Sequence, residues 1–451
     1  MGVQAEEFDV IVLGLGPGGE EVAGRLAEAG LAVAGVEARL VGGECPYWGC
    51  VPSKMMIRAA DLLAEARRIR GTAGRAAVIP DWTPVARRVR EEATDGWDDT
   101  TAAARFTGKG GTLVRGHGRL TGPREVLVDG ARLLRARRGV VVATGSQAAV
   151  PPIPGLAGTP YWTNHQAVEA TEVPESLVVL GGGAVGLELA QVFRRFGAEV
   201  TVVEAADRLL PQEEPEAGDL LAKVFAGEGV TVRTGTEISR VDHHGAAFTV
   251  MTDTGSHRAE RLLVATGRRS DLAALGAGAA GLDESAPALA VDGHMRAADG
   301  VWAVGDVTGK GPFTHIAMYQ ARIALADILG KPGPPAEYHA VPRVTFTDPE
   351  VGSVGPTERE SREKGLDVRV STVPLESSAR GWIAGAEGFV KLVADGNVLA
   401  GATVAGPSGG EVLALLTLAV HERIPVERLR SMIYAYPTFH RAVEDALAGL
   451  G

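Results

Sequence analysis

The length, composition and charge of the chain exclude several classes of protein. The chain has 451 residues, too many for one ordinary core, so we expect roughly two to four domains. Hydrophobic residues make up 45% and charged residues 22%, which is typical of globular proteins and not of disordered ones. The net charge of −11 argues against binding to nucleic acid or to an anionic membrane surface.

The sequence predicts neither a membrane span nor a secretory signal. No apolar run approaches the roughly 18 residues that cross a bilayer. The segment from Met1 to Asp9 is acidic, whereas a secretory signal starts with basic residues followed by an apolar stretch. We therefore expect a cytoplasmic protein.

The first predicted elements form a strand, a glycine-rich turn and a helix. An apolar strand over 10–13 leads into the turn, a helix is expected over 20–29, and a second strand over 31–36 ends at Glu37. The glycines and the proline of the turn are Gly14, Gly16, Pro17, Gly18 and Gly19. Such glycines allow a tight turn, close approach of the backbone to a pyrophosphate and packing of helix on strand, while the carboxylate accepts ribose hydroxyls. The pattern predicts a dinucleotide site.

The only two cysteines, Cys45 and Cys50, follow this unit. Two cysteines in a chain of this length do not make a disulfide scaffold. Two ligands are also too few for a zinc site, which normally has four, or three and a water. The pair therefore indicates a redox site, and we predict no metal.

A second unit repeats the first. A strand over 177–180 leads into Gly181, Gly183, Ala184, Val185 and Gly186, a helix is expected over 187–196, and a strand over 198–203 ends at Glu204. In both units the carboxylate follows the first glycine by 23 residues. Two further apolar strands echo each other, since both end in Ala-Thr-Gly, at Thr144-Gly145 and at Thr266-Gly267. The repetition makes accidental glycine turns an improbable explanation.

The remaining pattern predicts helices, linkers and a different C-terminal region. Helical stretches over 54–70 and 84–105 are assigned to the first domain, and segments 150–155 and 331–335 are rich in proline and glycine, as linkers are. Alternating strands are then expected over 341–347 and 389–393. An apolar helix over 411–421 and a short helix from about residue 438 follow.

The cysteine segment resembles a known family. Residues 42–54, both glycine units, and segments 304–306 and 347–355 closely resemble the flavoprotein disulfide reductases, which include dihydrolipoamide dehydrogenase, glutathione reductase and mercuric reductase. The resemblance implies an α/β fold with two Rossmann-like dinucleotide-binding domains, for FAD and NAD(P), and a C-terminal α+β dimerisation domain. It implies an FAD-binding domain over 1–149, an NAD(P)-binding domain over 150–267, a second part of the FAD-binding domain over 268–333 and a dimerisation domain over 334–451.

The same resemblance implies roles for particular residues. Glu37 is expected on the adenosine ribose of FAD and Asp306 on its ribityl chain, while Thr314 and His315 begin a helix at the flavin. The residues expected to hold FAD are Gly14, Gly16, Pro17, Gly18, Gly19, Glu37, Gly43, Lys54, Thr144, Gly145, Gly305, Asp306, Thr314 and His315. Those expected to hold NAD are Gly181, Gly183, Ala184, Val185, Gly186, Glu204, Thr266 and Gly267. Because the Glu204 carboxylate accepts a ribose 2′-hydroxyl and repels a 2′-phosphate, NADH is favoured over NADPH.

The resemblance also implies a route for the electrons. Cys50 faces the flavin, Cys45 attacks the substrate, and Lys54 forms a buried ion pair with Glu188 beside the flavin. Taken alone, Glu188 would more often be a solvated charge on a helix.

The C-terminal segment departs from its relatives. They have a His-Pro, followed five residues after the His by a Glu, and the His protonates the leaving thiol across the dimer interface. Here Tyr436 and Arg441 occupy those positions. A phenol with a pKa near 10 is a poorer proton shuttle at neutral pH than an imidazole near 6.5. His440 lies four residues after Tyr436, so a helical turn would bring the two together; the plainer reading of His440 is a partly exposed helix residue.

These observations predict a homodimeric enzyme that passes electrons from NAD(P)H through FAD and the two cysteines to a small disulfide or another acceptor. It resembles dihydrolipoamide dehydrogenase without the usual acid–base pair. The alternatives are a diaphorase that reduces quinones, an enzyme like mercuric reductase and a flavin-bound redox sensor. Tyr436 favours the mercury alternative, whereas the lack of a further cysteine pair near the C-terminus disfavours it.

Overall fold

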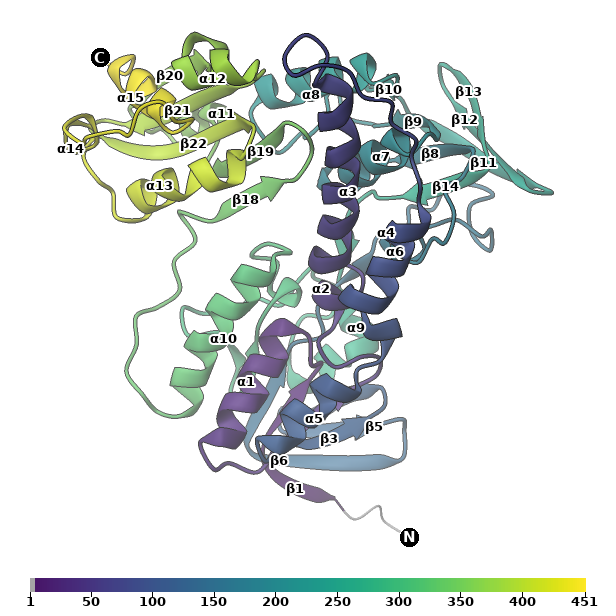
Figure 1. Ribbon diagram of the computed structural model, residues 1–451. Helices are drawn as coiled ribbons and strands as arrows, with labels where there is room; N and C mark the ends of the chain where they lie inside the picture. Colours follow the sequence, from purple (N-terminus) through teal and green to yellow (C-terminus); the bar gives the residue numbers. More distant parts are fainter. Residues whose placement is uncertain (1–4) are drawn as a thin grey trace. The chain divides into compact units, whose positions relative to one another are not determined.

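The computed structural model describes residues 5–451, in two compact units (Figure 1). Unit 1 comprises Met1–Met55, Arg87–Ala149 and Gly267–Glu337, and unit 2 comprises Met56–Ala86, Val150–Thr266 and Tyr338–Gly451. Residues 1–4, the start of the acidic N-terminal segment, lie outside the described residues. The units divide between residues 149 and 150, where the sequence predicts a domain boundary, and between residues 266 and 267, one residue before the next predicted boundary. The four-part division itself stays a prediction.

Unit 1 is built on a sheet whose five parallel strands lie in the order β3-β2-β1-β6-β17. The bounds are β1 (Glu6–Leu13), β2 (Val33–Glu37), β3 (Thr112–Arg115), β6 (Arg132–Val142) and β17 (Val301–Ala303). The antiparallel strands are β4 (Gly118–Gly122), β5 (Glu125–Val128) and β16 (Arg296–Ala298). The principal helices are α1 (Pro17–Glu28), α5 (Thr100–Gly108) and α10 (Thr314–Ile328). This strand order is that of a dinucleotide-binding fold, as the first glycine unit predicts.

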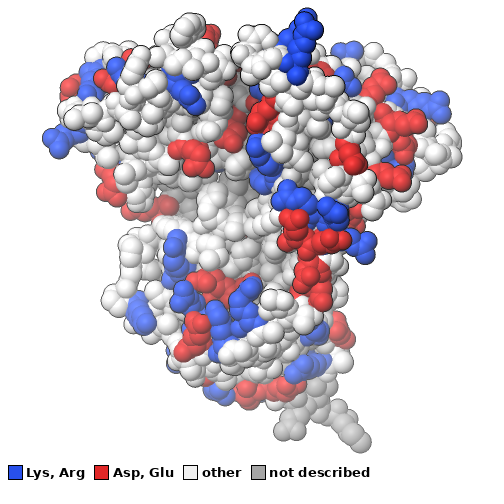
Figure 2. Space-filling view, in the orientation of Figure 1, with Lys and Arg blue, Asp and Glu red and all other residues white. Residues whose placement is uncertain are grey.

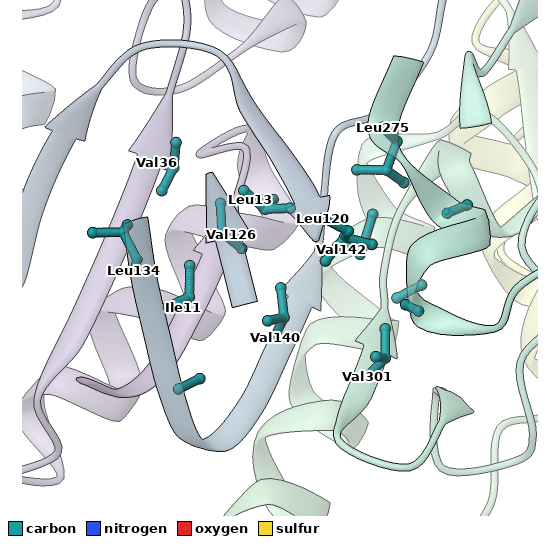
Figure 3. Close-up of a cluster of buried hydrophobic side chains, with 14 of the residues drawn as sticks. Ile11, Leu13, Val36, Leu120, Val126, Leu134, Val140, Val142, Leu275 and Val301 are labelled. Carbon is teal, nitrogen blue, oxygen red and sulfur yellow. The ribbon is translucent and has the colours of Figure 1, made fainter. Parts of the chain in front are cut away.

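A buried apolar cluster holds the middle of this sheet (Figure 3). Ile11 and Leu13 of β1, Val140 of β6 and Val301 of β17 are almost fully inaccessible to solvent. Leu275 of the short helix α9 (Leu272–Leu275) belongs to the same cluster. Because this cluster fixes neighbouring strands against each other, it also fixes the strand ends where the predicted site residues lie.

Unit 2 contains a second parallel sheet, with the order β10-β9-β8-β14. Its strands are β8 (Ser176–Leu180), β9 (Glu199–Val203), β10 (Thr231–Arg233) and β14 (Arg261–Val264), and its helices are α7 (Ala184–Arg195) and α8 (Pro215–Gly227). An antiparallel sheet of β11 (Ile238–His244), β12 (Ala247–Thr252) and β13 (Gly255–Ala259) accompanies it. The strand order repeats that of unit 1, so the duplication seen in the sequence is a duplication of the fold.

The C-terminal part of unit 2 is an antiparallel sheet with the order β18-β19-β22-β21-β20. The bounds are β18 (Pro342–Thr345), β19 (Glu350–Val354), β20 (Val368–Pro374), β21 (Phe389–Asp395) and β22 (Val398–Gly406). Helix α13 (Gly409–His421) packs on β19 and β22, and α15 (Arg441–Ala448) packs on β20 and β21. The predicted α+β character of this region is confirmed.

The remaining elements are short, apart from helix α3. They are α2 (Glu44–Tyr47), α3 (Cys50–Arg68), α4 (Thr83–Arg88), α6 (Asn164–Val168), α11 (Glu358–Glu363), α12 (Ala379–Ala384), α14 (Val426–Arg430), β7 (Gln147–Ala148) and β15 (Arg268–Arg269). No helix in the described part of the chain is long and apolar enough to cross a membrane. On the face shown in Figure 2, basic and acidic side chains are interspersed.

The helix predicted over 84–105 is broken. After α4 the chain forms a π-helical turn over Val89–Ala93 and a 3-10 turn over Asp95–Trp97 before α5 starts at Thr100. Asp95, Gly96 and Trp97 have φ angles of 50°, 66° and 60°, in the left-handed region. This region is incompatible with a continuing right-handed helix. Moreover, residues 56–86, predicted in the first domain, cluster with unit 2, where Trp82 packs on Phe193 and Phe196.

The last helix starts three residues later than predicted. Helix α15 begins at Arg441, and Tyr436 to His440 form turns. Pro437 has no N–H to donate, and the Thr438 hydroxyl donates to the carbonyl of Ala435 at 2.7 Å, which holds a turn at this point. The helical turn expected to bring His440 to Tyr436 is therefore not formed.

Replacing Gly186 with alanine should destabilise the protein, because the new Cβ would lie 2.2 Å from the carbonyl oxygen of Gly181. We expect a loss of about 1–3 kcal/mol in the free energy of unfolding. Gly183→Ala is the matched control, since its Cβ would meet nothing within 4 Å. Urea unfolding of the full chain measures both variants, and equal shifts in the two midpoints would contradict the prediction.

Candidate active site

The turn after β1 contains four glycines, of which Gly14 and Gly19 have no room for a Cβ and Gly16 has room for one. Gly14 has a φ of 88°, and a Cβ there would lie 2.5 Å from the carbonyl oxygen of Ala143. A Cβ on Gly19 would lie 2.0 Å from the oxygen of Gly14. Gly16 has only the Cα of Gly43 within 4.0 Å. Gly14 and Gly19 are thus required by packing, whereas Gly16 leaves the backbone accessible to a pyrophosphate at the start of α1.

The other predicted residues of this turn pack around it. Pro17 is the first residue of α1, and a Cβ on Gly18 would lie 3.1 Å from the oxygen of Ala317 in α10. Gly43 has a φ of 68° and lies against Gly16, where a Cβ would come within 2.7 Å of the Gly16 Cα. The structure therefore brings the segment before Cys45 onto the glycine turn.

The second unit reproduces this geometry. Gly181 has a φ of 108°, and a Cβ on it would lie 2.4 Å from the oxygen of Ala265, the counterpart of Ala143. Gly186, like Gly19, has no room for a Cβ, whereas Gly183, like Gly16, has room for one. Ala184 and Val185 begin α7, and Val185 is exposed at its first turn. The backbone beside Gly183 can receive a second dinucleotide.

The two carboxylates that end the second strands are held in the same way. Glu37 accepts the N–H groups of Leu15 at 2.7 Å and Arg39 at 2.8 Å. Glu204 accepts those of Gly182 at 2.6 Å and Ala206 at 2.7 Å. Both carboxylates are thereby fixed beside their glycine turns, where ribose hydroxyls would meet them.

Asp306 belongs to a polar group that sequence reasoning missed. Asp306 accepts the hydroxyl of Ser146 at 2.5 Å, and Arg268 donates to the same hydroxyl oxygen at 2.7 Å. Pairing of β7 with β15 brings Ser146 and Arg268 together. One signal was present in the sequence, because each of the two directly follows a Thr-Gly of the repeated strands, at Thr144-Gly145 and Thr266-Gly267.

Three further predicted residues lie close to these groups. Gly305 has a φ of 83°, and its N–H donates to Gln320 at 2.6 Å. Gly145 accepts the hydroxyl of Ser270 at 2.9 Å. The carbonyl of Gly267 accepts the N–H of Ala149 at 2.9 Å, so Gly267 belongs to unit 1, while Thr266 belongs to unit 2. A role for Gly267 in holding NAD stays a prediction.

The two thiols lie at the starts of helices. Cys45 is in the one-turn helix α2, and Cys50 is the first residue of α3. Helix α10 begins at Thr314, as predicted, and the Thr314 hydroxyl lies 3.4 Å from the Cys50 sulfur. His315 follows, with its ring stacked on Phe313. The N-termini of α3 and α10 thus both meet at one sulfur, where their partial positive charge favours a thiolate.

The environment makes the two thiols unequal. A hydrogen bond from Cys45, together with the Thr314 hydroxyl and the charge of Lys54, lowers the pKa of Cys50 to about 6. The hydrogen bond to Cys50 and burial raise the pKa of Cys45 above its ordinary value. At neutral pH Cys50 is therefore the thiolate and Cys45 the thiol that donates to it.

The predicted partners of the thiols lie in both units. Lys54 lies one turn after Cys50 on α3 and belongs to unit 1. Glu188 belongs to unit 2, is only 6% exposed, and accepts the N–H of Phe346 at 2.8 Å. Glu188 is therefore not a solvated helix charge, and its pairing with Lys54 stays a prediction.

The C-terminal candidates lie in unit 2. Tyr436 is 74% exposed, and the ring centroid of His440 lies 6.4 Å from that of Tyr434. Arg441, in the position of the relatives' Glu, pairs with Glu444 on α15. The roles of Tyr436 and His440 in proton transfer stay predictions.

Comparison with known proteins agrees with this geometry. The family model described as pyridine nucleotide-disulphide oxidoreductase matches residues 8–321, and its dimerisation domain matches residues 341–447. A dihydrolipoyl dehydrogenase of Thermus scotoductus is 35% identical over 98% of this chain and 97% of its own length. A mercuric reductase of Acidithiobacillus ferrooxidans is 34% identical over 96% of this chain and 81% of its own length.

Solved structures show the same fold. The HOCl-induced flavoprotein disulfide reductase RclA of Escherichia coli superimposes with a TM-score of 0.86 at 27% identity, covering 98% of this chain and 99% of that one. LpdA of Mycobacterium tuberculosis gives a TM-score of 0.84 at 26% identity, with coverage of 97% and 98%. Relatives thus cover the chain from the first glycine turn to the last helix, and the chain belongs to the pyridine nucleotide-disulphide oxidoreductase family of flavoenzymes.

Proposed function

We propose that this protein is an FAD-dependent NAD(P)H oxidoreductase that reduces a small disulfide through Cys45 and Cys50. The observation that carries the proposal is the unequal pair of thiols, one with a lowered pKa and the other hydrogen-bonded to it. A pair of thiols that alternates between dithiol and disulfide needs one sulfur that is readily a thiolate and a second sulfur that attacks the substrate disulfide.

The residues present fit two dinucleotides. Around the first turn, the open backbone at Gly16 suits the pyrophosphate of FAD, the fixed Glu37 carboxylate suits its ribose, and Asp306 suits its ribityl hydroxyls. The same features at Gly183 and Glu204 suit the nicotinamide coenzyme. When bound, FAD supplies the transfer of two electrons from reduced nicotinamide to a disulfide.

The two cysteines then carry out a balanced exchange. The Cys45 thiolate attacks the acceptor disulfide, so that a bond from Cys45 to substrate sulfur forms, the substrate S–S bond breaks, and one substrate thiolate leaves. The Cys50 thiolate attacks the Cys45 sulfur, which forms the Cys45–Cys50 disulfide and releases the second thiolate. The acceptor gains the two electrons that the dithiol loses, and the two released thiolates take up two protons.

Proton transfer is the weak part of this site. Cys45 must lose its proton before it attacks, and hydrogen bonding to Cys50 raises its pKa. General acid–base catalysis contributes a rate enhancement of about 10²–10⁴, and Tyr436 in place of an imidazole reduces this contribution. We therefore infer slow turnover of lipoamide.

We also infer a homodimer that prefers NADH. The match to a dimerisation domain and the exposure of Tyr436 and Ile433, which is 98% exposed, support a partner surface in the C-terminal region. The carboxylate of Glu204 supports NADH, because it would repel a 2′-phosphate.

Replacing Cys45 with serine should abolish reduction of disulfides and leave reduction of quinones, because quinones need only the reduced flavin. NADH oxidation is measured with lipoamide, small disulfides, a quinone and Hg(II) as acceptors. Disulfide reduction that persists in Cys45→Ser would contradict the proposal. Reduction of quinones alone by the unaltered protein would favour the diaphorase.

Replacing Thr314 with valine should raise the pKa of Cys50, because a donor to the thiolate is lost. In a Cys45→Ser background Cys50 is the only thiol, so its pKa follows from the pH dependence of alkylation by iodoacetamide. Near pH 6.5 we expect the alkylation rate to fall severalfold with valine and to be restored by Thr314→Ser. The same pKa with threonine and valine would show that the hydroxyl has no such role.

Comparison of kcat/KM for the two coenzymes tests the assignment of Glu204. We expect NADH to be the better substrate and Glu204→Gln to narrow the difference, since the amide removes the negative charge that opposes a 2′-phosphate. A strong preference of the unaltered protein for NADPH would overturn the assignment.

A further inference from the structure

The loop between β9 and α8, residues 204–214, closes back on the second glycine turn. Gly182, within this turn, donates its N–H to Glu204 at 2.6 Å, and its carbonyl accepts the N–H of Leu210 at 3.0 Å. A Cβ on Gly182 would lie 2.8 Å from the Leu209 side chain, so the loop also packs against the glycine. The backbone that is expected to receive the coenzyme is thus held at two points of the loop.

A buried ion pair ties the loop in turn to the C-terminal sheet. The N–H of Glu213 donates to the carbonyl of Leu210 at 2.9 Å. The Glu213 side chain is only 12% exposed, and its two oxygens accept Nε and Nη2 of Arg343 at 2.9 Å each. Arg343 lies on β18 and also donates to the carbonyl of Gly355 at 3.3 Å. Two backbone hydrogen bonds and one ion pair therefore join the glycine turn to β18.

A second buried pair holds the next residue of the loop. The side chains of Glu214 and of Lys391, on β21, are each 3% exposed, and the ammonium lies 2.9 Å from the carboxylate. Glu216 at 2.8 Å and Glu358 at 3.1 Å also surround this ammonium. Although burial disfavours the charged form, hydrogen bonds to these three carboxylates hold the pKa of Lys391 above its ordinary value. Two cations of the C-terminal sheet therefore fix two consecutive glutamates of the loop.

We propose that Arg343 and Lys391 are positioning residues for the nicotinamide coenzyme. They act through Glu213 and Glu214, which hold the loop against Gly182. A turn that is already fixed loses little freedom when a pyrophosphate binds to it, and this favours affinity. Loss of either cation leaves a buried carboxylate without its partner and releases the loop. This inference rests on the proposed function, because it takes the second glycine turn as the coenzyme site.

Removing either pair should weaken coenzyme binding without changing the chemistry. The double variants Arg343→Met/Glu213→Gln and Lys391→Met/Glu214→Gln remove both charges of a pair, so that no unpaired carboxylate destabilises the fold. In the FAD-loaded protein we expect the dissociation constant for NAD⁺ to rise on the order of tenfold. KM for NADH should rise with kcat nearly unchanged, as when uniform binding is lost. An unchanged dissociation constant would overturn the role of the cation concerned.

Arg430→Met is the matched control. The Arg430 side chain is 25% exposed, compared with 24% for Arg343, and it also pairs with a glutamate, Glu427 at 2.9 Å. Its guanidinium donates to the carbonyl of Leu447, within the C-terminal region. We expect this variant to bind NAD⁺ as the unaltered protein does. If it weakened binding as much as the double variants, the cause would be a general loosening of the C-terminal sheet, and the proposal would be wrong.

Amide hydrogen exchange tests the intermediate step. A peptide over 205–214 carries the N–H groups of Leu210 and Glu213, whose hydrogen bonds close the loop. We expect this peptide to exchange severalfold faster in the double variants and at the unaltered rate in Arg430→Met. Weaker binding without faster exchange would show that the loop is not the link, and would overturn the proposal.

The same titrations distinguish the two possible failures. If the unaltered protein binds neither NAD⁺ nor NADP⁺, the proposed function fails, and this inference fails with it. If the unaltered protein and both double variants bind NAD⁺ with equal affinity, the proposed function stands and only the positioning role fails.

Discussion

Both nucleotide units depend on one backbone contact, the approach of a glycine Cα to the carbonyl of the neighbouring strand. Parallel pairing places Leu13 of β1 beside Val142 of β6, so Gly14 and Ala143 meet where the strands end. Leu180 and Val264 place Gly181 and Ala265 in the same way. A side chain at either glycine would collide with a carbonyl that the sheet holds in place. The turn, the helix after it and the carboxylate fixed to the turn would have to move together.

The thiol pair shows how the same scaffold sets reactivity. Helix α10 starts beyond the end of the sheet of unit 1, and α3 starts after the segment that packs on the first glycine turn. Both helices direct their N-termini at Cys50, and Thr314 adds a hydroxyl. The thiolate at Cys50 then raises the pKa of Cys45 through their shared hydrogen bond. The inequality of the two sulfurs therefore follows first from their hydrogen bond to each other, and then from the Thr314 hydroxyl at the start of α10 and the charge of Lys54 in α3.

Local sequence patterns predicted the features that depend on a few neighbouring residues. The glycine spacing and the carboxylates Glu37 and Glu204 could be found because each is specified within a short stretch, whereas the start of α10 at Thr314 was implied by the family resemblance. The contact between Cys50 and Thr314 joins residues 264 positions apart, so it has no local signal. The segment over 84–105 was mispredicted because its composition favours a helix, whereas three residues adopt left-handed backbone there.

Helix α7 shows why the role of Glu188 could not be inferred from the neighbouring residues of its own helix. One face of α7 carries Glu188, Gln191 and Arg195, and all three bind the segment between β18 and β19. Glu188 accepts the N–H of Phe346, and Gln191 accepts the N–H of Asp348 at 2.8 Å and donates to its carbonyl at 3.0 Å.

Arg195 completes this face. It is 3% exposed, and its guanidinium pairs with Asp61 at 2.6 Å, Glu228 at 2.6 Å and Asp348 at 2.8 Å. A buried cation is tolerated only while such partners are in place, so these pairs hold α7 in one position. Because α7 begins at the second glycine turn, the C-terminal sheet fixes the helix on which the coenzyme is expected to bind. A carboxylate at position 188 is thus oriented by the segment between β18 and β19, more than 150 residues away, which no pattern within α7 could reveal.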